Sequence, residues 1–357
     1  MKRLQAVKLC VLTLAAVNTF MVAMALAQDV AGSLPINVTG EDRIAAATVT
    51  SSRFHLLLTK QAKAAGVSAE SSNVKFKSRI HAAVPKTTLP SPPANTFFYP
   101  DDVEKVSTTG ATIAHTANHP IYVNCASPNT PTTCFGGPGT FLTNLDASSM
   151  LHLADQYTGS TTNGRYTVGS SFSYSETIYP GTSGTPTLGE NDILTLVHSA
   201  AKTGGTGYAN IYHVFLPNGV DTCMDAGPCY SPDNVNSFAF CGYHYTVKFP
   251  DLASPVYYTV IPYQGAWAAP ANNLCTLPAG TVNGPLVDSM ATVVTHELFE
   301  TITDPDITTG YRAVNSNFGE VGDVCEGIIF NGIGMNGHNY AVQAIYSDKY
   351  EACATTP

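Results

Sequence analysis

His296, Glu297 and Glu300 stand in the order H-E-x-x-E. Successive residues of a helix are about 100° apart, so His296 and Glu300 would lie one turn apart on the same face. This is the H-E-x-x-H layout with a carboxylate in place of the second histidine; in that layout the outer side chains bind zinc and the Glu between them acts as general base. The pattern predicts His296 and Glu300 as metal ligands and Glu297 as the catalytic base. Zinc is the expected ion, and a mixed histidine–carboxylate site would also accept manganese or iron.

Further ligands are expected about 20 residues downstream, where Glu320 and Asp323 lie in a glycine-containing segment. The competing interpretation of this segment is a turn held by a disulfide at Cys325, with its acids facing water. His244 is an additional candidate as ligand or substrate contact, against the alternative of a structural histidine.

Calcium is the alternative to zinc, because calcium prefers oxygen ligands and would leave His296 out. Asp304 follows Glu300 by one further turn, although Pro305 would pull it out of the helix. The oxygen-only set consists of Asp304, Asp306, Glu320 and Asp323.

The element that positions this motif is predicted to be a core helix over 288–304, closed by Pro305. Its other residues are apolar and β-branched, and unpaired charge in such a helix is costly. Two strands, 243–249 and 256–262, precede it and are joined by a turn at 250–251. An antiparallel pair followed by the active helix is the order found in zincin-type metallopeptidases.

The remaining patterns predict a loop-rich α/β (α+β) protein with a zincin-like mixed sheet and one central helix. The expected strands are 121–123 and 210–217, with short strands and turns over 158–188. The expected helices are 53–65, 141–157 and 191–203.

The first 27 residues have the features of a secretory signal peptide. Lys2, Arg3 and Lys8 precede a long apolar run, which ends in the small-x-small sequence 25–27. An uncleaved anchor helix is the alternative. Cleavage predicts an extracellular, periplasmic or cell-wall-associated protein that has no further membrane segment.

The 357 residues include 17 Lys and Arg against 26 Asp and Glu, a formal net charge of −9. Removing three basic residues with the signal peptide makes this −12, which argues against nucleic-acid binding. Residues 28–110 hold nine basic and seven acidic residues and end in a Pro-rich linker at 85–93. They form either a pro-segment or spacer, or an arm packed on the main domain, 111–357.

Nine cysteines are present, and Cys10 falls in the signal peptide. An even number in an exported chain predicts disulfides, and no C-x-x-C pair supports zinc–cysteine sites. Proximity in the sequence favours four bridges: Cys125–Cys134, Cys223–Cys229, Cys241–Cys275 and Cys325–Cys353.

Three segments, 240–244 (FCGYH), 295–300 (THELFE) and 319–327 (GEVGDVCEG), resemble the EXORDIUM, or phosphate-induced protein 1, family in their order. The closing segment 340–353 is similar to the C-terminal strand of that family. The resemblance covers about 118–353; it is specific from residue 241 onward and weak before 210.

The resemblance implies an extracellular, wall-associated protein and brings no established catalytic activity. It points to the site residues His296, Glu297, Glu300, Glu320 and Asp323. Plant members of the family carry Asn at the position of Asp304, so the resemblance does not require this ligand.

Two hypotheses follow. The first is a metal-dependent hydrolase, peptidase-like in its substrate. The second is a non-catalytic wall or matrix protein in which the same acids bind a structural ion or pair with local donors. The Thr-, Tyr- and Asn-rich surface is a candidate for binding wall polysaccharide, although such a composition is also ordinary for a secreted β-rich protein. A glycosidase using Glu297 and Glu320 is a further combination that the spacing does not single out. The sequence contains no G-x-S-x-G elbow and no Gly-rich phosphate loop.

Overall fold

The computed structural model describes residues 33–70, 93–99, 101–125, 130–178, 181, 184–225, 227–232, 234, 238–265, 275–313 and 319–357. The predicted signal peptide 1–27 and the greater part of the Pro-rich linker, 85–92, lie outside these residues. Mixed α/β architecture and four disulfides are present, as the sequence predicts.

A seven-stranded mixed sheet forms the centre of the molecule, in the strand order β1-β6-β5-β8-β12-β11-β2. Within it, β11 runs antiparallel to both of its neighbours, while the pairs from β1 to β12 are parallel. In sheet order, the strands are β1 (Leu34–Pro35), β6 (Phe172–Tyr174), β5 (Ala117–Val123), β8 (Asn210–Phe215), β12 (Val256–Ile261), β11 (Phe240–Lys248) and β2 (Ser51–Leu58).

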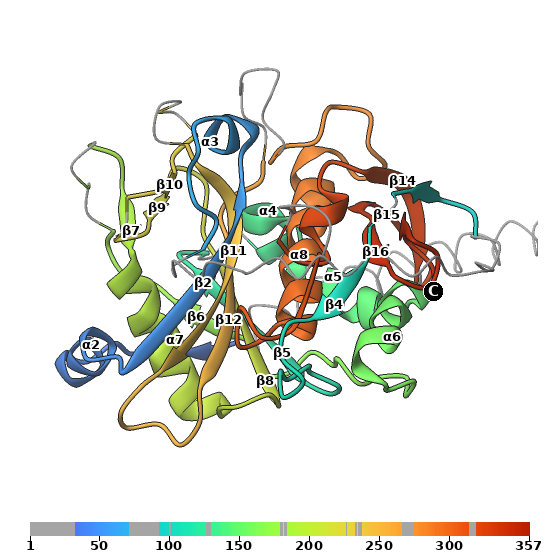
Figure 1. Cartoon of the computed structure of the whole chain (residues 1–357). Helices are drawn as coiled ribbons and strands as arrows, with labels where there is room; N and C mark the ends of the chain where they lie inside the picture. Colours follow the sequence, from blue (N-terminus) through green and yellow to red (C-terminus); the bar gives the residue numbers. More distant parts are fainter. Residues whose placement is uncertain are drawn as a thin grey trace, which may run out of the picture.

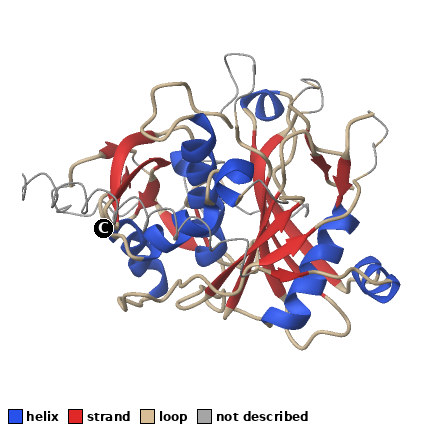
Figure 2. Ribbon diagram, turned by 180° about the vertical axis from the view of Figure 1, so that it is seen from behind, coloured by secondary structure: helices blue, strands red, loops and turns tan. Residues whose placement is uncertain are grey.

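Helices cover both faces of this sheet (Figure 1). α7 (Glu190–Gly204) and α2 (Gly40–Ala47) lie on one face, and α8 (Pro285–Thr303) lies on the other. The view from behind shows the same layering, with further short helices beside α8 (Figure 2). These are α4 (Pro131–Phe135), α5 (Pro138–Asp146), α6 (Asp155–Thr158) and the 3-10 helix η1 (Ser149–Ala154).

Smaller sheets surround this framework. Their strands are β7 (Thr187–Gly189), β9 (Asp221–Cys223) and β10 (Cys229–Tyr230); β4 (Val103–Lys105) and β13 (Tyr311–Ala313); β14 (Ile329–Met335) and β15 (His338–Gln343); and β3 (Thr96–Phe98), β16 (Ile345–Ser347) and β17 (Ala352–Ala354).

The central helix α8 has the predicted core character, since every residue from Asp288 to Thr303 is buried. It starts at Pro285, which suits a first helical position because its missing N–H would have no partner there. In the first turn, the Asp288 carboxylate accepts hydrogen bonds from the backbone of Asn283 at 2.7 Å and of Ala341 in β15 at 2.9 Å. This side chain therefore ties the helix to the strand on its outer side.

The predicted antiparallel pair before this helix is present as β11 and β12. The predicted strand 210–217 and helix 191–203 correspond to β8 and α7. The predicted helix 141–157 is broken into α5, η1 and α6. Ser148 lies at the first break and donates its hydroxyl to the carbonyl of Leu145 at 2.7 Å, a local bond that competes with regular helix continuation.

The predicted helix 53–65 is wrong. The segment forms the edge strand β2 and then a separate short helix, α3 (Lys60–Ala64). Thr59 separates them, with an extended backbone and a side chain that caps α3 by accepting from Ala62 N at 3.2 Å. A short apolar run and a short helix had the appearance of one periodic segment. Two strands of the main sheet, residues 34–35 and 51–58, therefore come from the predicted N-terminal segment 28–110.

The four disulfides join the pairs favoured by proximity: Cys125–Cys134, Cys223–Cys229, Cys241–Cys275 and Cys325–Cys353. Among the described residues, none of the helices combines the length and apolar character needed to cross a bilayer.

His213 on β8 is buried and neutral because its partners suit the uncharged ring. Its Nδ1 lies 2.8 Å from Thr259 Oγ1, and its Nε2 lies 2.9 Å from Asn118 Oδ1, whose own amide nitrogen donates to Tyr166 O. Burial, together with the nearby His119, lowers the pKa of His213 to about 3.

We expect His213 to make the fold acid-sensitive. Between about pH 6.5 and pH 3, His213 is protonated in the unfolded chain and neutral in the folded chain. The free energy of unfolding therefore falls by roughly 1.4 kcal/mol for each pH unit of acidification in this range. His213→Gln keeps one donor and one acceptor and cannot titrate. Denaturant unfolding at pH 7 and pH 4.5 should show a smaller loss of stability in the variant; parallel pH profiles would contradict this.

Candidate metal centre

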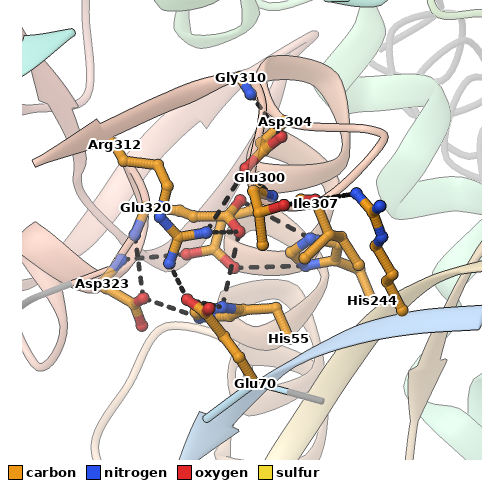
Figure 3. Close-up of polar contacts among 12 residues, drawn as sticks. His55, Glu70, His244, Glu300, Asp304, Ile307, Gly310, Arg312, Glu320 and Asp323 are labelled. Carbon is orange, nitrogen blue, oxygen red and sulfur yellow. Dashed lines mark hydrogen bonds and ion pairs between the residues drawn. The ribbon is translucent and has the colours of Figure 1, made fainter. Parts of the chain in front are cut away.

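The candidate site lies between α8 and the strands β11 and β2, where acids and histidines from four elements come together (Figure 3). α8 carries His296, Glu297 and Glu300, and β11 carries His244. Glu320 lies in the turn before the 3-10 helix η2 (Asp323–Cys325), and Asp323 is the first residue of η2. The edge strand β2 adds His55, which the sequence analysis did not identify.

The helical geometry expected of the motif is present, since His296 Nε2 lies 3.1 Å from Glu300 Oε1. On the other side of Glu300, Oε2 lies 3.5 Å from Nδ1 of His244. His244 in turn reaches Glu297 Oε2 at 3.4 Å and, through Nε2, Glu320 Oε2 at 3.6 Å. Glu300 is therefore the centre of the cluster.

Within the described residues, three groups have ligand atoms lying within 4.8 Å of one another, and Glu300 belongs to each. The groups are His244, Glu300 and Glu320; His296, Glu297 and Glu300; and His55, Glu300 and Asp323. All the predicted site residues except Asp304 and Asp306 fall in one of these groups.

Two glycines allow the backbone of β11 and of the turn before η2 to approach the acids of α8 closely. A Cβ on Gly242 would lie 2.7 Å from Val293 Cγ1 and 3.0 Å from Glu297 Oε1. A Cβ on Gly322 would lie 2.7 Å from Glu300 Oε1. Real Cβ atoms do not approach other atoms this closely, so any larger residue at either position would push the acids of α8 away.

Gln343, the last residue of β15, contacts the Nδ1 side of His296, away from Glu300. Its amide nitrogen lies 3.0 Å from His296 Nδ1 and donates to the carbonyl of Gly322 at 2.8 Å. These two contacts fix the plane of the imidazole and leave its Nε2 facing Glu300.

Arg312 on β13 compensates the acids on the outer side of the cluster. Its guanidinium lies 3.0 Å from Glu320 Oε1 and 3.4 Å from Asp304 Oδ2, and it also pairs with Glu70. Burial alone would lower the pKa of Arg312, but Glu320, Glu70, Asp304 and Asp323 outweigh it and raise the pKa.

Asp304 closes the turn after α8. Its oxygens accept hydrogen bonds from the backbone N–H groups of Thr308, Thr309 and Gly310 at 2.8, 3.1 and 2.6 Å. Ile307 and Thr308 have positive φ angles of 44° and 82°, a conformation that these bonds support. The Asp304 carboxylate is thus occupied by the turn and by Arg312.

Burial and proximity move the pKa values of the cluster in opposite directions. Burial alone would lower the pKa of His244, but Glu320, Glu297 and Glu300 raise it to about 10. The pKa values of His55 and His296 are also raised by neighbouring carboxylates in spite of burial. Burial raises the pKa of Glu297 and of Glu320, whereas the histidines around Glu300 overcome burial and lower its pKa.

Several polar atoms of the cluster are buried without a hydrogen-bond partner. At most 1% of each of these side chains is exposed to solvent. The atoms are His55 Nδ1, His244 Nε2, His296 Nε2, Glu297 Oε1, Glu300 Oε2 and Glu320 Oε2. Unpartnered buried polar atoms are costly, and here they are gathered at one place in the fold.

His55, Glu70 and Gln343 are the site residues that sequence reasoning missed. His55 stands in the short apolar run Phe54–Leu58, which is buried at every position, and such a run cannot be assigned to a strand or a helix by its periodicity alone. The pairing of β2 with β11 sets His55 directly opposite His244. This pairing joins residues almost 190 positions apart, and no local pattern indicates it.

Comparisons with protein-family models, with curated proteins and with solved structures find no match to this chain.

We expect the loss of Arg312 to destabilise the fold strongly. Arg312→Met leaves three carboxylates without their shared cation in a buried place, and breaking such a network costs about 3–5 kcal/mol. Arg43→Met is the matched control, because Arg43 is exposed and its ion pairs contribute less than about 1 kcal/mol. Denaturant unfolding of both variants in metal-free buffer tests this; equal, small effects would contradict it.

Proposed function

We propose that this is an exported protein that binds a divalent transition-metal ion at Glu300 and uses it for hydrolysis, with peptides as the substrate class. The proposed ligands are His244, Glu300 and Glu320, with His296 beside them, and Glu297 is the proposed general base. The observation that carries the proposal is the convergence of unpartnered buried atoms from β11, α8 and the turn before η2.

The donor set favours a transition metal over calcium. Each of the three groups found in the described residues contains a histidine, and imidazole nitrogen suits zinc, manganese or iron, whereas calcium takes oxygen ligands. Two members of the oxygen-only set already have partners. Asp304 is bonded to its turn, and Asp306 accepts hydrogen bonds from the hydroxyls of Tyr208 and Tyr257.

A divalent ion bound here would act as a Lewis acid and would lower the pKa of a coordinated water. The residues of the chain would bind the ion, orient its ligands and accept the proton. Glu297 presents an oxygen with no hydrogen bond beside His244 and Glu300, which is the position required of a base that takes a proton from water. Gln343 orients His296, and Arg312 holds Glu320 through its other oxygen.

Other features support parts of the proposal. The order of the antiparallel pair β11–β12 and then the helix α8 is that of a zincin-like enzyme. The predicted signal peptide and the four disulfides favour export. The resemblance to the EXORDIUM family favours membership in that family and association with the cell wall.

A second candidate function has one observation in its favour. The metal-ligating side chains are almost completely buried, and a closed site is typical of structural ions. In this case the protein is a non-catalytic wall or matrix protein that binds polysaccharide, and the ion stabilises its core.

We expect the purified protein to hold zinc after reloading and removal of excess metal. Glu300→Gln should abolish binding, and His244→Ala should weaken it at least tenfold, because each change removes a ligand. Glu297→Gln should keep the metal and slow hydrolysis of a quenched fluorescent peptide library about a hundredfold or more. Elemental analysis and the peptide assay measure the two effects.

His213→Gln is the matched control, since it alters a buried histidine of the same sheet outside the cluster. Absence of bound transition metal in the unaltered protein would overturn the proposal. Metal without hydrolysis of any peptide, in both the unaltered protein and Glu297→Gln, would favour the structural ion.

We also expect zinc binding to be strongly pH-dependent. The raised pKa of His244, about 10, means that zinc must displace its proton, so the apparent affinity should rise about tenfold per pH unit for each proton released. The stability of the metal-free fold changes with pH in the opposite direction: the contribution of protonated His244 is complete below about pH 6.5 and is lost as the pH rises from there to about 10. Titrations between pH 5.5 and 7.5 test this; a constant affinity would contradict it.

A further inference from the structure

The group made of His55, Glu300 and Asp323 is not used by the proposed ion, although it shares Glu300 with it. His55 Nε2 lies 2.8 Å from Asp323 Oδ2. Two donors about 2.1 Å from one zinc ion are separated by roughly 3 Å, so this spacing suits two ligands of one metal. We propose that the cluster binds two divalent ions bridged by Glu300, with His55 and Asp323 as ligands of the second. This rests on the proposed function and extends it.

The two oxygens of Glu300 face different partners, as a bridging carboxylate requires. Oε2 faces His244 at 3.5 Å. Oε1 accepts the backbone N–H of Asp323 at 3.1 Å and lies 3.1 Å from His296 Nε2, on the side where His55 meets Asp323. One position therefore has Glu300 Oε2, His244 and Glu320, and the other has Glu300 Oε1, His55 and Asp323, with His296 next to it.

The sheet sets the separation of the two positions. His55 and His244 are directly opposed in the β2–β11 pair, and their rings stack with centroids 5.5 Å apart. Glu320 lies between the two rings, with Oε2 3.6 Å from His244 Nε2 and Oε1 3.5 Å from His55 Nδ1, and Asp323 meets His55 Nε2 on the far side. In two-metal hydrolases the ions are about 3.5–4 Å apart, a distance that one carboxylate can bridge.

The charge of the cluster also favours two ions. Among the described residues it holds six carboxylates, and the Arg312 guanidinium pairs with three of them, Glu70, Asp304 and Glu320. The carboxylates are Glu70, Glu297, Glu300, Asp304, Glu320 and Asp323. With neutral histidines, one divalent ion leaves three uncompensated negative charges in a buried place, and two ions leave one.

His55 is the buried histidine of the second position, with 1% of it exposed. Its Nε2 faces Asp323 Oδ2, whereas its Nδ1, which has no hydrogen bond, faces Glu320 Oε1 at 3.5 Å and Glu70 Oε1 at 3.7 Å. Because His55 comes from β2, the second ion would tie residues 51–58 to α8 and to the turn before η2. The N-terminal segment would then be part of the metal centre.

The test is the number of ions bound by the full chain. The metal-free protein is titrated with Mn²⁺ or Zn²⁺, and bound metal is counted by elemental analysis after gel filtration. We expect two ions per chain, one in His55→Ala and in His55→Gln, one in His244→Ala, and none in Glu300→Gln. His213→Gln should retain two. Circular dichroism confirms that each variant is folded.

Mn²⁺ electron paramagnetic resonance supplies a second readout. In the doubly loaded protein, coupling between neighbouring ions should broaden the signal, and either His55 variant should restore the spectrum of an isolated ion. One ion in the unaltered protein, or two ions in folded His55→Gln, would overturn the second position and leave the proposed function intact. No bound ion in the unaltered protein would overturn both.

Discussion

The structure is organised around a group of carboxylates buried in an otherwise apolar core. Ionised acids at this depth are tolerated only when cations and hydrogen bonds surround them. Arg312 supplies one cation, and three histidines from two strands and a helix face the remaining oxygens. Neighbouring features serve the same requirement. Gly242 and Gly322 let the backbone approach the acids, and the Cys325–Cys353 disulfide holds the turn that carries Glu320 and Asp323.

A row of polar side chains across the sheet illustrates how neighbours decide the role of a histidine. Strand register sets His55, His244, Thr259 and His213 side by side on β2, β11, β12 and β8. His213 faces a hydroxyl and an amide, and burial lowers its pKa. His244 faces three glutamates, which raise its pKa in spite of equal burial. The first is therefore a neutral core residue, and the second carries a proton that a metal ion can replace.

The sequence predicted those parts of the site that depend on local spacing. His296 and Glu300 are one turn apart because a helix makes them so, and the disulfides join cysteines that proximity in the sequence had paired. The helix α8 and the strands β8, β11 and β12 have patterns that indicate their type. His55 could not be predicted, because its place depends on β2 pairing with a strand almost 190 residues later. A one-residue shift in that register would turn His55 to the opposite face of the sheet.

The segments that carry the resemblance to the EXORDIUM family lie far apart in the sequence, yet they meet at one point of the fold. The first contributes Gly242 and His244, the second Glu297 and Glu300, and the third Glu320, Gly322 and Asp323. Residues held together by a shared ligand depend on one another, since a change in any one of them leaves buried charge uncompensated in the others. The convergence of these residues on Glu300 is therefore the feature on which the proposed metal centre depends.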